Sequence, residues 1–203
     1  MVSSKDYYKK ITHKWKNEYP SSQDINEVWS FYKECGYTNP QQTLKNIMDK
    51  VFWKKKKVLD LGCDNGLMLK IICDWYPVIT GVGVDINSIA IAKAQQLFSD
   101  FTFDTFDGVN LPYEDKSFDL IFISAVVKHI RYEDRENFYK EINRVADNVF
   151  IIEADSKIKE QVSHHSWILY HSNFEEEFKQ YFKPIEVIYE SGDLLGLYRC
   201  KAS

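Results

Sequence analysis

The chain has 203 residues, of which 44% are hydrophobic and 15% are aromatic, so it can fill one sizeable core. Its formal net charge of −4 disfavours non-specific electrostatic binding to nucleic acid or to an anionic membrane. No apolar run approaches the roughly 20 residues that span a bilayer, and the opening MVSSKDYYKK lacks the apolar core of a secretion signal. We therefore expect a single domain over residues 1–203, located in the cytoplasm, with neither a membrane nor a nucleic-acid partner.

Two local features carry little functional information. The basic run at residues 54–57 precedes an apolar strand, which is typical of a solvated edge, and a phosphate-contacting patch is the alternative. The four cysteines form no C-x-x-C pair, so they indicate reduced thiols rather than a metal knuckle or a redox motif.

The predicted elements fall into three parts along the chain. Residues 1–52 are helical and rich in aromatic side chains, which is more typical of the core of an N-terminal cap than of a substrate cage. From residue 53 onward, the runs KVLDLG, ITGVGVD, FTFDTF, FDLIFIS and NVFIIEA predict strands that alternate with helical patterns. Such alternation predicts parallel pairing through right-handed crossovers. The final IEVIYESGDLLGLYRCK predicts an antiparallel hairpin that turns at residues 191–193.

The stretch VLDLGCDNG is the most informative part of the sequence. An apolar strand meets an acid at Asp60, and a loop with Gly62 and Gly66 follows. In an open α/β sheet ligands bind beyond the carboxyl ends of the strands, and glycine lets the backbone approach a ligand closely. A dinucleotide fingerprint, G-x-G-x-x-G, would require glycine where this chain has Asp64 and Leu67, so the pattern disfavours a pyrophosphate.

Two further acids end the next two predicted strands. Asp85 lies 25 residues after Asp60, where a carboxylate can accept both hydroxyl groups of a ribose. Asp107 follows the third strand, where it can accept an adenine amino group beside the amide of Gly108. Three acids at successive strand ends suit a positively charged nucleoside better than a nucleotide phosphate.

With these motifs the chain resembles the class I S-adenosylmethionine-dependent methyltransferases, of the small type 11 kind. VLDLGCDNG resembles the family's first motif, GVGVDINSIAIAKAQ its ribose motif, and FDGVNLPYEDKSFDLIFISAVVKHI its adenine motif and following strand. The similarity runs from about Lys57 to Glu153. It implies a Rossmann-like, doubly wound α/β fold with a seven-stranded, mostly parallel sheet at residues 53–203, and S-adenosylmethionine as the cofactor.

The resemblance also implies roles at the methionine end of this cofactor. Asp60 would hold the methionyl amino group, and Gly62 and Cys63 would offer backbone to the methionyl portion. Gly66 would let the following helix begin close to the strand. Ser124, at the end of the fourth strand, would lie beside the methionine end.

At the nucleoside end the resemblance implies four residues. Asp85 would take the ribose hydroxyl groups, and Ile86 would pack against the adenine. Asp107 and Gly108 would read the edge of the adenine.

Two positions depart from the family pattern. Asp64 replaces a glycine that is common in the loop, and aspartate tolerates left-handed backbone better than most residues, so we expect binding to be kept. The usual Pro-Gly-Gly turn before the fifth strand is missing, and we expect a shortened loop with Asp147 and Asn148 as its turn.

Candidate catalytic histidines lie after the fourth and fifth strands. His129 follows the fourth strand and could act as a general base, or it could only brace the next helix. His164 and His165 lie in the loop that usually shapes the acceptor pocket; they could contact the acceptor, move a proton or form ordinary polar surface. Adjacent side chains diverge on a regular element, and no carboxylate lies at standard ligand spacing, so we expect no metal.

The sequence thus predicts an enzyme that transfers a methyl group to an oxygen or nitrogen of a small molecule, such as a sugar or another hydroxylated metabolite. One alternative is methylation of a protein or peptide. Another is a catalytically idle subunit that keeps the fold and the cofactor. The sequence does not specify the acceptor or the oligomeric state.

Overall fold

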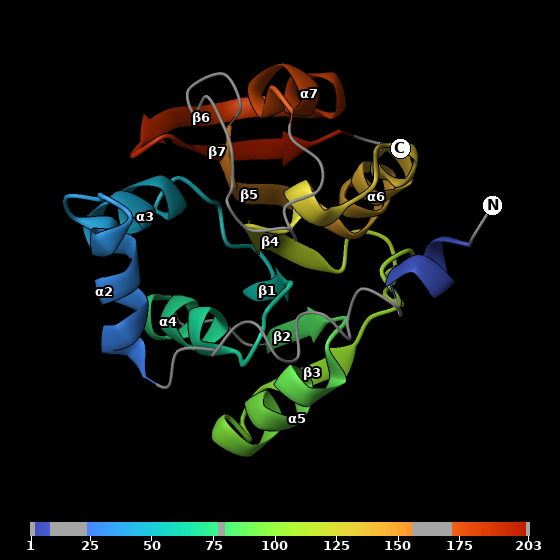
Figure 1. Cartoon of the computed structure of the whole chain (residues 1–203), viewed down its shortest axis with the longest axis horizontal. Helices are drawn as coiled ribbons and strands as arrows, with labels where there is room; N and C mark the ends of the chain where they lie inside the picture. The colour runs from blue at the N-terminus through green and yellow to red at the C-terminus, as the bar shows by residue number, and fades with distance from the viewer. Residues whose placement is uncertain (1–2, 9–23, 77–79, 156–171, 202–203) are drawn as a thin grey trace.

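The computed structural model describes residues 3–8, 24–76, 80–155 and 172–201. These residues form a seven-stranded sheet with the order β3-β2-β1-β4-β5-β7-β6 (Figure 1). The first five strands pair in parallel, and β7 is antiparallel to both β5 and β6. The strands are β1 Lys57–Leu61, β2 Thr80–Asp85, β3 Thr102–Thr105, β4 Phe118–Ser124, β5 Ala146–Ala154, β6 Phe182–Glu190 and β7 Asp193–Cys200. The expected Rossmann-like sheet with a C-terminal antiparallel hairpin is confirmed.

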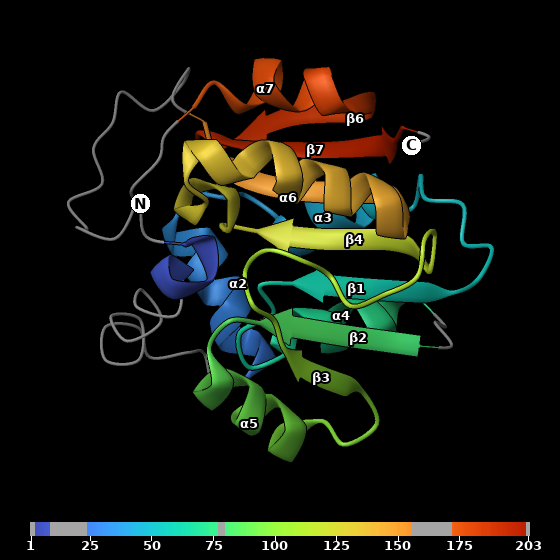
Figure 2. The same ribbon diagram turned by 90° about the vertical axis from the view of Figure 1, so that its right-hand side faces the viewer.

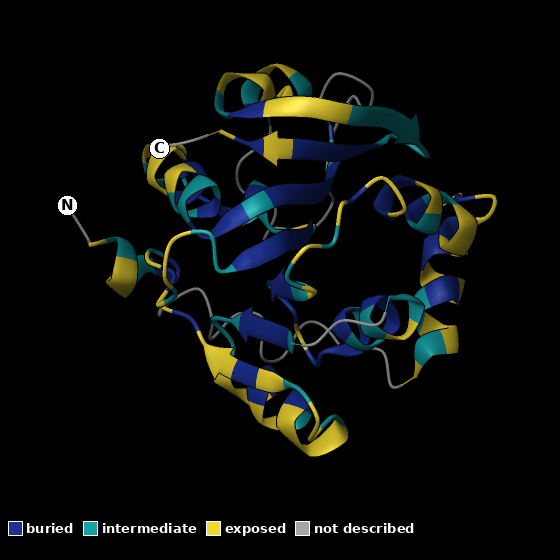
Figure 3. Ribbon diagram, turned by 180° about the vertical axis from the view of Figure 1, so that it is seen from behind, coloured by how far each residue is buried: buried dark blue, intermediate teal, exposed yellow. Residues whose placement is uncertain are grey.

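Helices cover both faces of this sheet, as the alternating pattern predicts (Figure 1). One core lies under α2, α3, α4 and α5, and the other lies under α6, α7 and a short N-terminal helix at residues 4–8. The central strands are buried on both faces, whereas β6 at the sheet edge is largely exposed or half-buried (Figure 3). The helices are α2 Ile25–Glu34, α3 Pro40–Met48, α4 Leu67–Trp75, α5 Ser88–Leu97, the 3₁₀ helix η1 Val127–His129, α6 Tyr132–Val145 and α7 Phe174–Tyr181.

Local sequence signals explain where the N-terminal helices begin. Asp24 accepts hydrogen bonds from the amides of Asn26 and Glu27, and the Glu27 carboxylate accepts the Asp24 amide in return, which completes a capping box for α2. Pro40 occupies the first turn of α3, where its missing N–H is harmless. In the described parts of the chain, no helix combines the length and apolar character that crossing a bilayer requires.

The C-terminal hairpin follows from its turn residues. Ser191 and Gly192 both have positive φ, 56° and 85°, as a two-residue turn with the twist of antiparallel strands requires. Glu190 and Asp193 therefore pair directly at the end of the hairpin.

The predicted turn at Asp147 and Asn148 is wrong. α6 ends at Val145 and β5 begins at the next residue, so both residues lie inside the strand. Asn148 is buried, and its side-chain amide donates to the carbonyl of Asp119 at 2.9 Å. A turn-forming side chain is tolerated within the strand because its polar group has a partner.

Asp119, near the start of β4, fixes the chain that leads into β1. Its carboxylate is 1% exposed and accepts the backbone amides of Lys54 at 3.1 Å, Lys55 at 2.9 Å and Lys57 at 2.9 Å. The side chains of Lys54 and Lys56 are exposed, as a solvated edge requires. Asp119 therefore sets the position of the basic run and of the strand that carries Asp60.

Replacing Asp119 with alanine is expected to lower the free energy of unfolding by about 2–4 kcal/mol, because three backbone amides lose a buried carboxylate acceptor. Chemical denaturation monitored by circular dichroism measures the change. Asp115→Ala is the matched control, since that carboxylate is 72% exposed in its ion pair with Arg144 and should contribute under about 1 kcal/mol. Equal effects of the two substitutions would contradict this role for Asp119.

Candidate functional site

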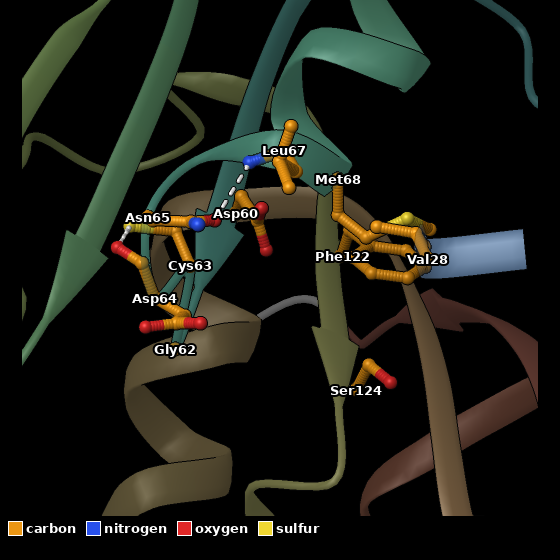
Figure 4. A pocket seen from close by; sticks show the side chains of 10 residues that line it. All are labelled: Val28, Asp60, Gly62, Cys63, Asp64, Asn65, Leu67, Met68, Phe122 and Ser124. Atoms are coloured by element: carbon orange, nitrogen blue, oxygen red, sulfur yellow. Dashed lines mark hydrogen bonds between the residues drawn. The ribbon is translucent and has the colours of Figure 1, made fainter. Parts of the chain in front are cut away.

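A pocket of about 130 Å³ opens at the carboxyl ends of the central strands (Figure 4). In Figure 2 the arrowheads of β1, β2 and β4 point to the same side, where the N-terminal helix and α2 lie. The pocket is lined by residues of α2, β1, the loop after it, α4 and β4: Val28, Asp60, Gly62, Cys63, Asp64, Asn65, Leu67, Met68, Phe122 and Ser124. Four predicted site residues, those on β1, in its loop and at the end of β4, therefore share one cavity.

The loop between β1 and α4 depends on left-handed backbone. Gly62 and Gly66 both have φ of 83°, and Asp64 adopts φ of 48°, as expected for an aspartate in place of glycine. A Cβ at Gly62 would lie 2.3 Å from a methyl group of Val126, so the close approach of the two strand-end turns requires glycine there. A Cβ at Gly66 would lie 2.6 Å from the ring of Phe103.

Asp60 is the penultimate residue of β1, and its side chain projects toward the pocket centre in Figure 4. The residue is 2% exposed, and its Oδ2 has no hydrogen-bond partner among the residues that the structure describes. Burial raises the pKa of Asp60 to about 8, and the neighbouring charges of Asp85 and Asp64 act in the same direction. A backbone hydrogen bond from Leu69 in α4 opposes this shift. The pocket therefore contains a carboxyl group that a bound cation would return to its charged form.

Asp85, at the end of β2, braces the glycine loop. One carboxylate oxygen accepts the amide of Asp64 at 3.0 Å, and the other accepts the amide of Asn87 at 2.8 Å. Burial raises the pKa of Asp85 to about 6, although these backbone hydrogen bonds lower it. Each oxygen keeps lone pairs that can accept further hydrogen bonds. Ile86, which follows, is half-buried against the core.

Asp107, after β3, contacts the N-terminal helix. Its Oδ1 accepts the amides of Val109 at 2.9 Å and Asn110 at 3.0 Å, and its Oδ2 lies 2.7 Å from Nζ of Lys5. A Cβ at Gly108 would lie 2.7 Å from the ring of Tyr8, so the N-terminal helix covers this position. No local sequence pattern predicts this contact, because it joins residues about 100 positions apart.

The sheet order brings the three predicted acids together. Because β1, β2 and β3 are neighbours, Asp60, Asp85 and Asp107 follow one another along the same edge of the sheet. Neighbouring strands lie about 4.8 Å apart, so the row has roughly the reach of a nucleoside with a short side chain.

Of the three predicted catalytic histidines, the structure describes only His129. His129 is half-buried in η1, and it is not among the residues that line the pocket. η1 is itself held by Glu153, whose Oε1 accepts the amide of Val127 at 2.6 Å. Burial raises the pKa of Glu153 to about 7, while nearby Lys128 lowers it. His164 and His165 lie outside the described residues.

One pocket neighbour was missed by the sequence reasoning. Tyr32 of α2 lies one helical turn after the pocket residue Val28, and its hydroxyl lies 3.3 Å from Oγ of Ser124. The i, i+4 spacing of Val28 and Tyr32 was the available signal, because such residues share one helix face. The sequence alone did not show which face of α2 meets the sheet.

Comparisons with known proteins agree with this geometry. Residues 59–148 match the family model described as a methyltransferase domain. Norajmaline N-methyltransferase of Rauvolfia serpentina is 35% identical over 106 residues, which cover 50% of this chain and 36% of the relative. Tocopherol O-methyltransferase of Arabidopsis thaliana is 29% identical over 126 residues, which cover 58% of this chain and 35% of the relative. These matches thus span little more than a third of the length of either relative.

A solved structure gives the same result for the fold. The crystal structure of PH0226 protein from Pyrococcus horikoshii OT3 superposes with a TM-score of 0.71 at 22% identity, covering 93% of this chain and 99% of that one. The strand order defines a Rossmann-like, doubly wound α/β domain, a fold in which ligands bind beyond the carboxyl ends of the parallel strands. The methyltransferase-domain match covers 90 of the 203 residues, and the superposition shows that the chain shares the fold of the solved structure.

Asp60→Asn is expected to stabilise the ligand-free protein in a pH-dependent way. The folded protein keeps Asp60 protonated up to about pH 8, whereas the unfolded chain ionises it near the ordinary value of 3.8. The unfolded chain then binds fewer protons, so wild-type stability falls as pH rises through this window. At pH 8 the variant should be more stable by about 1–3 kcal/mol, and the gain should vanish below pH 4.

Denaturation series between pH 4 and pH 8 measure this difference. Asp74→Asn, on an exposed turn of α4, is the control and should show no comparable trend. A constant difference between Asp60→Asn and the wild type across the range would show that Asp60 has an ordinary titration in the folded protein.

Proposed function

We propose that this chain transfers a methyl group from S-adenosylmethionine to an oxygen or nitrogen of a small molecule. The family match and the relatives named for N- and O-methylation support this proposal. A sugar or another hydroxylated metabolite is the acceptor class that we would screen first. A location in the cytoplasm remains a prediction from the sequence.

The observation that carries the proposal is the buried Oδ2 of Asp60, which has no hydrogen-bond partner within residues 3–8, 24–76, 80–155 and 172–201. A buried carboxylate without a partner is costly, so the site suits a ligand that brings a positive charge and hydrogen-bond donors. Gly62, where a side chain would collide with Val126, also lines this cavity, so its backbone can contact a ligand there. Both features fit the methionyl end of S-adenosylmethionine, whose sulfonium supplies an electrophilic methyl group.

On this proposal Asp60 binds the methionyl amino group, and the backbone of Gly62 and Cys63 contacts the rest of the methionyl portion. Gly66 lets α4 begin against the sheet, and Ser124 lies beside the methionine end.

The nucleoside then lies along the acids of β2 and β3. Asp85 accepts the ribose hydroxyl groups with the lone pairs that its two backbone hydrogen bonds leave open. Ile86 packs against the adenine, and Asp107 with Gly108 contacts its edge. Asp107 already accepts Lys5 and two amides, so an adenine amino group would share this carboxylate with the N-terminal helix.

Calorimetry tests the donor assignment. S-adenosylmethionine is expected to bind at least about tenfold more tightly than NAD or ATP, because strand-end carboxylates repel phosphates. Asp85→Ala should weaken binding by about 1.5–3 kcal/mol, whereas Asp100→Ala, at an exposed position after α5, should not. Comparable affinity for NAD, or a change under about 0.5 kcal/mol in Asp85→Ala, would refute the assignment.

The catalytic base is a separate prediction. If the acceptor is a hydroxyl group, His129 would remove its proton, and His129→Gln should lower turnover by about 10²–10⁴-fold with cofactor affinity nearly unchanged. The wild-type rate should rise between about pH 5 and pH 8, and the variant should lose this step.

The control variants are His164→Gln and His165→Gln. If one of these abolishes turnover while His129→Gln is fully active, the base is one of the two histidines that follow β5 in the sequence. If all three variants are active, alignment alone carries the reaction, and the acceptor arrives already deprotonated.

A methyl-release assay on pools of small molecules, with a peptide pool beside it, separates the acceptor classes. Tight cofactor binding without methyl release on either pool would favour the idle-subunit alternative over an enzyme.

A further inference from the structure

Tyr32 links the N-terminal cap to the methionine end of the pocket. Its hydroxyl oxygen lies 3.3 Å from Oγ of Ser124, which lines the pocket at the end of β4. Either hydroxyl can donate this hydrogen bond, and both oxygens keep lone pairs in either case. We call these two side chains the hydroxyl pair.

Packing holds this hydroxyl pair in place. Tyr32 is 8% exposed, and its ring lies edge-on to Tyr37 with the ring centroids 5.1 Å apart. The ring centroid of Trp29, one turn earlier in α2, lies 6.2 Å from the ring centroid of Tyr32. A ring fixed on two sides holds its hydroxyl oxygen in one place beside Ser124 before a ligand enters.

Two carboxyl groups lie near the hydroxyl of Tyr32. Burial raises the pKa of Tyr32 to about 12, the hydrogen bond with Ser124 lowers it, and the charge of Asp193 raises it, as does the charge of Asp60 when that carboxyl group is ionised. Tyr32 is therefore neutral near pH 7, and it lies within electrostatic reach of two carboxyl groups. Its oxygen keeps lone pairs that can face a positive charge at this end of the pocket.

We propose that the hydroxyl pair makes the site prefer the sulfonium donor over the demethylated thioether product. This inference rests on the proposed function. The two ligands share nearly all of their atoms, but only the donor carries a positive charge on sulfur. Oxygen atoms that are held in place beside the pocket can turn lone pairs toward that charge, and they interact only weakly with the neutral thioether. Tyr32 acts partly through Ser124, so it is a positioning residue for the donor.

The test is a comparison of two dissociation constants by calorimetry, one for S-adenosylmethionine and one for S-adenosylhomocysteine. Their ratio defines the preference for the donor. Tyr32→Phe and Ser124→Ala should each reduce this preference by about three- to tenfold, mainly by weakening the binding of S-adenosylmethionine. The double variant should lose no more than the larger single effect, because both changes remove the same pair.

Tyr37→Phe is the matched control. It removes a hydroxyl from the same aromatic cluster, one that donates to Asp193 at 3.0 Å, and it leaves the pair intact. The preference should then stay within about twofold of the wild type. Thermal unfolding of each variant reports whether it is folded, and Ser124→Ala decides the question if Tyr32→Phe does not fold.

An unchanged ratio of the two dissociation constants in both Tyr32→Phe and Ser124→Ala would overturn the inference. This includes the case in which both ligands bind equally more weakly, because a purely structural role affects both alike. A wild type that binds neither ligand would instead refute the proposed function, so the two failures are distinguishable.

Discussion

The arrangement of the site depends on one constraint: the carboxyl group of Asp60 is buried at the end of the central strand β1 with one oxygen unpartnered in the described structure. Burying such a group is unfavourable, and the second acid at the end of β2 adds to the penalty. In a domain stabilised by only a few kcal/mol, this penalty is substantial. A cationic ligand would offset it, which is why we assign the methionyl amino group to this position.

The loop after β1 and the turn after β4 lie beside this carboxyl group. Gly62 brings the first loop against Val126, and Ala125, just before it, has φ of 58°, which is strained for a residue with a side chain. Glu153 then fixes the following 3₁₀ helix through the amide of Val127. The turn after β4 is thus held from both neighbouring strands, and on the other face α2 covers the pocket.

The sequence predicted the sheet well because its signals are local: apolar runs, alternating helices and a turn with two positive φ angles. The left-handed backbone of the first loop was predictable for the same reason, because glycine and aspartate are the residue types that adopt positive φ most readily. The prediction of a turn at Asp147 and Asn148 was wrong because the hydrogen bond from the Asn148 side chain to the carbonyl of Asp119 outweighs the turn preference of asparagine. Contacts such as Tyr32 with Ser124 or Lys5 with Asp107 join distant segments, and no local pattern specifies them.

Proton release on cofactor binding is the most direct measurement of the central claim. If the methionyl amino group binds Asp60, binding near pH 7 must convert a largely protonated carboxyl group into a carboxylate. Calorimetry of S-adenosylmethionine in buffers with different ionisation enthalpies should then show the release of a large fraction of one proton. Asp60→Asn should abolish most of this release. Binding without any proton release in the wild type would contradict the assignment of Asp60.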